Sequence, residues 1–177
     1  MRHATDLLVQ YAAYHRDRRN ITTHFVGIPL IVFAIGVLLA RPQFDLGGLT
    51  LSPAWILWAL SAVWYLTRGN LVLGATTAAA TGILILLAQP LAAGSTASWL
   101  TWGVASFVVG WVLQFIGHYY EGRKPAFVDD IVGLLVGPMF VTGEMLFALG
   151  LCKPLVEEIE RRVGPTVLRD LAAPLAR

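Results

Sequence analysis

The feature of this sequence that most limits its fold is the length of its uncharged stretches. Residues 25–40, 46–67 and 69–117 carry no charged side chain and no histidine. The last stretch is too long for one membrane helix, because about 20 apolar residues cross the hydrocarbon core of a bilayer, and a Pro- and Gly-containing break at 89–95 divides it. The pattern predicts an all-α integral membrane bundle with four transmembrane helices, near 25–40, 53–67, 71–88 and 97–117.

Composition agrees with a membrane protein. Apolar residues make up 56% of the chain and charged residues 14%, against about 25% charged in soluble domains, which argues against a soluble enzyme and a disordered chain. The formal net charge of +2 gives no indication of nucleic-acid binding. The single cysteine, Cys152, excludes an internal disulfide. Several predicted spans are shorter than 20 residues, so we expect local thinning of the bilayer or extension through flanking polar residues.

The segments that flank the spans differ in character. The stretch 131–152 contains Gly137-Pro138 and the acidic Glu144, and therefore predicts a broken or re-entrant helix pair. After it, apolar residues at helical spacing predict a C-terminal amphipathic surface helix. We expect one membrane domain, 1–177, with a surface helix and turn at 1–24, four spans within 25–117, a site loop at 118–130, the broken helix at 131–152 and a surface tail at 153–177.

The basic residues predict the topology. With four spans, twelve Lys and Arg residues lie on one side and only Arg41 on the other, which by the positive-inside rule places both termini in the cytoplasm. The membrane would be the bacterial inner membrane, or the endoplasmic reticulum in a eukaryote. The twelve residues are Arg2, Arg16, Arg18, Arg19, Arg68, Arg123, Lys124, Lys153, Arg161, Arg162, Arg169 and Arg177.

Three of the four histidines, His15, His24 and His118, lie at span ends. An even number of crossings between them puts all three on one membrane face. His15 and His24 would point in opposite directions on one straight helix, so the chain must bend between them to bring them together. Capping residues at positions 20, 22 and 23 predict a surface helix near 3–18, a turn, and a span that begins near His24.

A second polar cluster ends the fourth span. Gln114, His118 and Glu121 share one helical face, and imidazole with carboxylate is a ligand set of non-haem iron and of zinc. Arg123 and Lys124 fit either a topology signal or a clamp for a carboxylate.

Simpler interpretations remain open for the polar residues. Histidines at helix ends are often interfacial residues without a ligand. His3 fits a tail residue, Asp129 and Asp130 fit helix caps, and Glu144 fits a packing carboxylate.

Two motifs resemble a known family. They are Tyr14-His15, Asn20 and His24-Phe25-Val26-Gly27-Ile28-Pro29 in the first part, and Gln114-Phe115-Ile116-Gly117-His118-Tyr119-Tyr120-Glu121-Gly122-Arg123-Lys124-Pro125-Ala126 in the second. Together with Gly137-Pro138-Met139-Phe140 and Glu144, they resemble the membrane iron(II)-dependent 2-hydroxy fatty acid dioxygenases of fungi and bacteria. The resemblance extends over nearly the whole chain to about residue 150.

The resemblance implies an activity and a site. The substrates would be a long-chain 2-hydroxy fatty acid and O2, the cofactor Fe(2+), and the product a fatty acid one carbon shorter. His15, His24 and His118 would bind the iron, and Glu121 would be a further ligand or a hydrogen-bond acceptor beside it. The carboxylate of the substrate would then bind Arg123 or Lys124, with Asn20 or Gln114 on the hydroxyl or on a histidine N–H.

Other classes compete with this interpretation. A di-iron fatty-acyl desaturase or hydroxylase would carry many more histidines than four. A transporter would place polar residues at membrane depth, where this chain has only Glu144. In an assembly protein the three histidines would be incidental.

Overall fold

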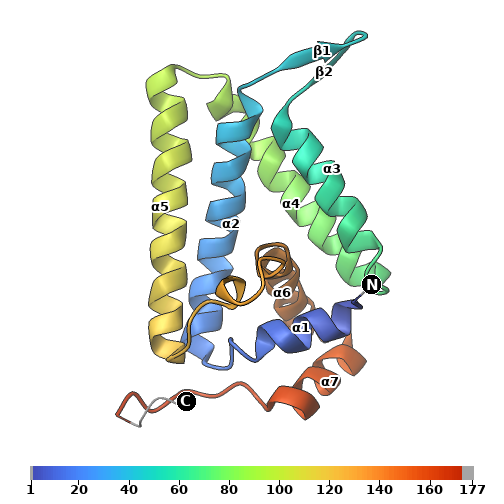
Figure 1. Cartoon of the computed structure of the whole chain (residues 1–177), viewed down its shortest axis with the longest axis vertical. Coiled ribbons are helices and arrows are strands. Elements are labelled where there is room, and N and C mark those ends of the chain that lie inside the picture. The colour runs from blue at the N-terminus through green and yellow to red at the C-terminus, as the bar shows by residue number, and fades with distance from the viewer. Residues whose placement is uncertain (1, 173–177) are drawn as a thin grey trace.

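The computed structural model describes residues 2–172, and nearly all of its regular structure is helical, as predicted (Figure 1). Arg177 and the rest of the tail beyond Ala172 lie outside the described residues. The elements are α1 Ala4–Ala12, α2 Arg18–Ala40, β1 Phe44–Leu46, β2 Leu49–Leu51, α3 Pro53–Leu66, α4 Leu71–Ala92, α5 Thr96–Glu121, the 3-10 turn η1 Ala126–Val128, α6 Gly133–Ala148 and α7 Lys153–Val163.

The helices α2, α4 and α5 are long and apolar enough to cross a membrane. The remaining expected span, at 53–67, corresponds to α3, which is present but has only 14 residues. A bent pair, α6 with α7, also meets the criteria for one span if its two helices are taken together. The structure therefore supports three to four membrane spans. The expected extension through polar residues is seen in α2, which begins at Arg18, and in α5, which continues to Glu121.

Helices α2 and α5 lie side by side along most of their length (Figure 1). Glycines on α5 recur every seven residues, at positions 103, 110 and 117, and each faces α2. A Cβ atom on Gly110 would lie 2.6 Å from Ile31 Cγ1 and 2.9 Å from the carbonyl oxygen of Gly27. Small residues at such crossings let two membrane helices approach closely, which here brings the start of α2 against the end of α5.

Most of the basic residues gather at one end of the bundle, as predicted. The N–H of Ala4 donates to the Arg68 carbonyl at 2.8 Å, which joins the N-terminal helix to the turn between α3 and α4. A guanidinium nitrogen of Arg123 donates to the Ala13 carbonyl at 2.8 Å. Arg41 is the C-cap residue of α2, and its Nη2 donates to Thr96 Oγ1 at 3.0 Å. The unpredicted β1–β2 hairpin follows α2 in the chain and lies at the opposite end of the bundle from α1 and α7 (Figure 1).

The stretch 131–152 breaks later than its sequence predicts. Helix α6 continues through Pro138, because membrane helices tolerate an internal proline where their surroundings compensate for the lost backbone hydrogen bond. The break comes at residues 149–152, where Cys152 has a φ of 55° and the chain turns by 113° into α7.

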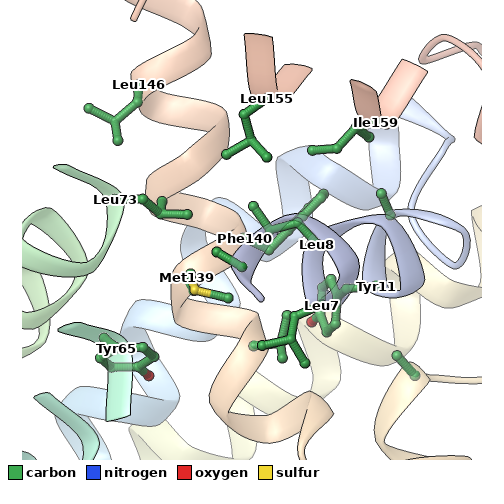
Figure 2. Packing of buried hydrophobic residues seen from close by; sticks show 14 of the residues in the cluster. Leu7, Leu8, Tyr11, Tyr65, Leu73, Met139, Phe140, Leu146, Leu155 and Ile159 are labelled. Atoms are coloured by element: carbon green, nitrogen blue, oxygen red, sulfur yellow. The ribbon is translucent and has the colours of Figure 1, made fainter. Parts of the chain in front are cut away.

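The predicted C-terminal amphipathic helix is α7, which packs its apolar face against α1. Leu155 and Ile159 are buried and point toward Leu8 and Phe140 (Figure 2). Burial of each such side chain contributes about 2 kcal/mol. This packing fixes α1, and with it Tyr11, directly beside the histidines.

Candidate metal centre

Three histidines from two elements and a turn meet inside the protein. His15 comes from the turn between α1 and α2, His24 from the second turn of α2, and His118 from the last turn of α5. One ligand nitrogen of each lies within 4.8 Å of the other two. Their side chains are 0%, 1% and 6% exposed. The expectation that the three gather at one end of the bundle is confirmed.

The bend between His15 and His24 is present, but it lies earlier than predicted. Helix α1 ends at Ala12, and α2 starts at Arg18 with Asp17 as its N-cap, whose side chain accepts from the N–H of Arg19 at 2.8 Å. Asp is among the strongest N-cap residues, and Asp17 precedes the capping residues that we predicted at positions 20, 22 and 23. Because the turn lies at 13–17, His15 sits in the turn itself and faces back toward α2.

Backbone carbonyls fix the orientation of two imidazole rings. His15 Nδ1 bonds to the Tyr11 carbonyl at 2.7 Å, and His24 Nδ1 bonds to the Asn20 carbonyl at 2.8 Å. A carbonyl only accepts, so both Nδ1 atoms carry the proton, and in the neutral rings both Nε2 atoms carry a lone pair. The Tyr11 ring also stacks on His15, with centroids 4.1 Å apart and 4° between planes.

The residues present fit a bound metal ion. The two Nε2 atoms lie 3.0 Å apart, where facing lone pairs repel unless a cation or a proton lies between them. Burial, with the nearby His24 and His118 adding to it, holds the pKa of His15 well below its usual 6.5, which disfavours the proton. Two imidazole nitrogens that bind one ion at about 2.1 Å each, with an angle of about 90° at the ion, would lie about 3 Å apart.

Glu121 lies beside this group with both carboxylate oxygens engaged. Oε1 accepts from the N–H of Arg16 at 2.9 Å, and Oε2 accepts from the N–H of Asp17 at 2.8 Å and from Asn20 Nδ2 at 3.0 Å. The carboxylate therefore holds the turn that carries His15 against the end of α5. Nothing in the sequence pattern indicated this contact, since it joins residues more than 100 positions apart.

The two basic residues after α5 are held by other partners. Arg123 bonds to the Ala13 carbonyl, and Lys124 forms an ion pair with Asp129 at 2.6 Å. Asp129 also accepts from the Tyr14 hydroxyl at 2.7 Å. Lys124 first, and then Tyr14, lower the pKa of the Asp129 carboxyl. These contacts join the loop after α5 to the turn at residues 13–15.

The other polar residues left open by the sequence lie apart from the histidines. Asp130 pairs with Arg2 at 2.7 Å and accepts from the N–H of Val132 at 3.0 Å, in the turn before α6. It does not cap α6, whose N-cap residue is Val132. His3 packs against Gly69 at the turn between α3 and α4. Glu144 is partly buried in α6.

An apolar cavity of about 270 Å³ begins at the histidines. His24 and His118 form part of its wall, which continues along α2 to Ile35 and along α5 to Phe107. Gln114 also lines it, and its buried Nε2 has no hydrogen-bond partner among residues 2–172. His24 and Ile35 are eleven positions apart on α2, a distance of about 16 Å, so the space suits a long, narrow apolar group with a polar end at the histidines.

Comparison with known proteins agrees with these observations. A family model described as "2-hydroxy-palmitic acid dioxygenase Mpo1-like" matches residues 1–149. The chain belongs to the Mpo1-like family. A curated relative, the 2-hydroxy-palmitic acid dioxygenase MPO1 of Saccharomyces cerevisiae, is 30% identical over 154 residues, which cover 85% of this chain and 83% of the yeast protein. No solved structure matches. The Mpo1-like region includes all three histidines and α6, whereas α7 and the segment after it lie beyond the match.

Sequence reasoning missed two residues that shape the site. Tyr11 supplies both the carbonyl and the stacked ring for His15, and its position four residues before His15 was an available signal. Asp17 begins α2 and so places His24. An Asp ahead of the basic run Arg18-Arg19 is a recognisable N-cap.

Proposed function

We propose that this protein is an iron(II)-dependent dioxygenase that shortens long-chain 2-hydroxy fatty acids by one carbon. The observation that carries the proposal is the buried group of His15, His24 and His118 at the end of an apolar cavity. Membership of a family named for 2-hydroxy-palmitic acid dioxygenase supports the substrate class.

In this proposal His15, His24 and His118 are the iron ligands, because neutral imidazole nitrogens suit non-haem iron. Bound iron would supply a centre at which the 2-hydroxy acid and O2 meet. The carbonyls of Tyr11 and Asn20 keep the Nδ1 protons in place and thereby aim each Nε2 inward. Such contacts to the outer nitrogen of a ligand histidine commonly account for a 10–100-fold change in metal affinity.

Glu121 acts as a positioning residue in this account. Its oxygens accept from the backbone N–H groups on either side of the Arg16–Asp17 peptide and from Asn20. Loss of the carboxylate would free the turn and let His15 move away from His24.

The cavity would hold the acyl chain of the substrate, with its carboxylate and hydroxyl at the histidines. Gln114 is the polar residue of the cavity wall with a free donor, so its amide would bond to the substrate oxygens. Arg123 and Lys124 do not line this cavity. Asn20 uses its amide nitrogen on Tyr14 and Glu121 and would act through the position of His24.

The proposed reaction balances without a further reductant. One 2-hydroxy acid and one O2 give the shorter fatty acid, CO2 and water. The amphiphilic substrate also explains why the site lies at the end of a membrane bundle, since its tail favours hydrocarbon and its head favours water. By the positive-inside rule we assign this end to the cytoplasm.

Incubation of the purified protein with ferrous iron, air and 2-hydroxypalmitate tests the activity. Mass spectrometry should detect pentadecanoate, together with consumption of one O2 per product. Palmitate, which lacks the hydroxyl, should give no product, and neither should the His118→Ala variant. Shortening of palmitate at the same rate, or product formation by the variant, would contradict the proposal.

A further inference from the structure

A second cavity, of about 380 Å³, lies at the same end of the protein as the histidines but shares no lining residue with the apolar cavity. Three segments far apart in the sequence form its walls: the turn before α2, the end of α5, and the segment after α7. Each contributes one arginine. They are Arg16, Arg123 and Arg169.

The segment after α7 is joined to the turn before α2 by backbone hydrogen bonds. The N–H of Val167 donates to the Arg16 carbonyl at 2.8 Å, and the N–H of Arg18 donates to the Val167 carbonyl at 2.9 Å. The N–H of Arg169 donates to Asp17 Oδ2 at 2.8 Å. In Figure 1 this segment passes below the start of α2 toward the lower end of α5. The third wall is therefore a fixed part of the fold, and it lies beyond the residues matched by the family model.

Each of the three guanidinium groups is held in place by a backbone carbonyl. Arg16 Nη1 donates to Gly164 at 2.9 Å, Arg123 Nη1 to Ala13 at 2.8 Å, and Arg169 Nε to Tyr120 at 2.8 Å. Each group retains further N–H donors, since a guanidinium has five. The three side chains are thus oriented without using all of their donors.

None of these three arginines forms an ion pair with a described carboxylate, whereas Arg2, Arg19, Arg161 and Arg162 at the same end of the protein all do. The two carboxylates in the cavity wall have other partners. Asp17 accepts from Arg19 and from the N–H of Arg169, and Glu121 accepts from two backbone N–H groups and from Asn20. The wall thus carries three guanidinium groups against two carboxylates, and this excess of positive charge favours a bound anion.

We infer that this cavity binds phosphate, either as part of the headgroup of an anionic lipid or as the free ion. Arginine forks match the oxygens of phosphate and bind it through two parallel hydrogen bonds. The volume exceeds that of a phosphate ion several times over, so an ester substituent also fits. The basic end of the bundle is the level at which lipid headgroups lie. The cavity shares no lining residue with the proposed acyl-chain cavity, although Glu121 and Asp17 in its wall also hold the turn that carries His15.

Calorimetric titration of the full-length protein in an uncharged detergent tests the inference. The two probes are inorganic phosphate and dihexanoyl-phosphatidylglycerol, with dihexanoylglycerol as the lipid that lacks phosphate. At least one phosphate probe should bind, and Arg16→Gln, Arg123→Gln and Arg169→Gln should each weaken it tenfold or more. Higher salt should weaken it as well. Arg18→Gln is the matched control, because Arg18 is exposed, lies two positions after Arg16 and does not line the cavity. The affinity of this variant for the phosphate probe should stay within twofold of the unmodified protein.

The arms of the experiment distinguish the sources of phosphate. Binding of inorganic phosphate supports a free anion, and binding of the phospholipid alone supports a headgroup. The inference is overturned if neither phosphate probe binds, if dihexanoylglycerol binds as well as the phospholipid, or if Arg18→Gln weakens binding as much as the cavity variants. Displacement of the probe by 2-hydroxypalmitate would also overturn it, because the cavity would then belong to the substrate. If Arg16→Gln unfolds the protein, Arg123→Gln and Arg169→Gln decide.

Discussion

His15 and His24 direct their Nε2 atoms toward one another at 3.0 Å, while their Nδ1 atoms are each bonded to a backbone carbonyl. The tautomers are therefore fixed by the fold, and both inner nitrogens present lone pairs to a space that no apolar group fills favourably. His118 adds a third nitrogen to that space. A cation bound between these nitrogens, as we propose, would remove the repulsion between their lone pairs.

The unfolding free energy of the metal-free protein should depend on pH through His15. Its folded pKa is held well below 6.5 by burial, whereas the unfolded chain has the usual value. Below about pH 6.5 the unfolded state therefore binds a proton that the folded state does not, and stability should fall by up to about 1.4 kcal/mol per pH unit; above it, this contribution is zero. Thermal unfolding from pH 7.5 to 5 should show a smaller slope in His15→Gln, and equal slopes would contradict the prediction.

Glu121→Gln should weaken iron binding about 10–100-fold without changing the number of ions bound. The amide has one oxygen in place of two, so it cannot accept from both backbone N–H groups of the turn that carries His15. Competition with a chelator measures the affinity. Glu158→Gln, in α7, removes a carboxylate that pairs with Arg161 and Arg162 and should leave the affinity unchanged. An unaltered affinity in Glu121→Gln would show that the carboxylate does not position the ligand.

Gly117→Ala should lower the unfolding free energy by about 1–3 kcal/mol and reduce metal binding. A Cβ atom at this position would collide with the side chains of Asn20 and Thr23 and push the end of α5, with His118, away from α2. Gly143→Ala is the control, because its Cβ would meet other side chains only at 3.6 Å or beyond. Unfolding temperature and iron content, measured on both variants, check the prediction; equal effects would contradict it.

Ile35→Trp should shift the substrate preference toward shorter acyl chains. Ile35 lines the cavity about 16 Å from His24 along the helix axis, so a larger side chain there removes space from the end of the acyl tail. The ratio of kcat/KM for 2-hydroxylaurate to that for 2-hydroxypalmitate should rise at least tenfold. Val108→Trp, on the exposed face of α5, should leave this ratio unchanged. The same ratio in both variants would place the acyl chain elsewhere.

The sequence was sufficient to predict the elements that depend on long apolar runs and on the number of crossings. The distribution of charge located the four main helices, and the expected even number of crossings correctly predicted that His15, His24 and His118 lie together at one end. These predictions hold because a lipid environment leaves a helix few alternatives.

The sequence was not sufficient for contacts made between distant segments. The partners of Glu121 and the pairing of Val167 with residues 16–18 join positions more than 100 residues apart and follow no periodicity. The exact bend also escaped prediction, because Asp17 and Asn20 are both good caps and tertiary packing selected the first. Likewise, Pro138 was read as a break, although packing against neighbouring helices keeps α6 continuous.

X-ray absorption at the iron edge of the ferrous protein tests the central claim most directly. The account predicts one iron per chain with about three imidazole nitrogens in its first coordination sphere, at about 2.1 Å. His15→Ala, His24→Ala and His118→Ala should each lose the bound iron, whereas His3→Ala, at a histidine outside the group, should keep it. Iron retained in all three variants, or a spectrum without imidazole scattering, would contradict the account.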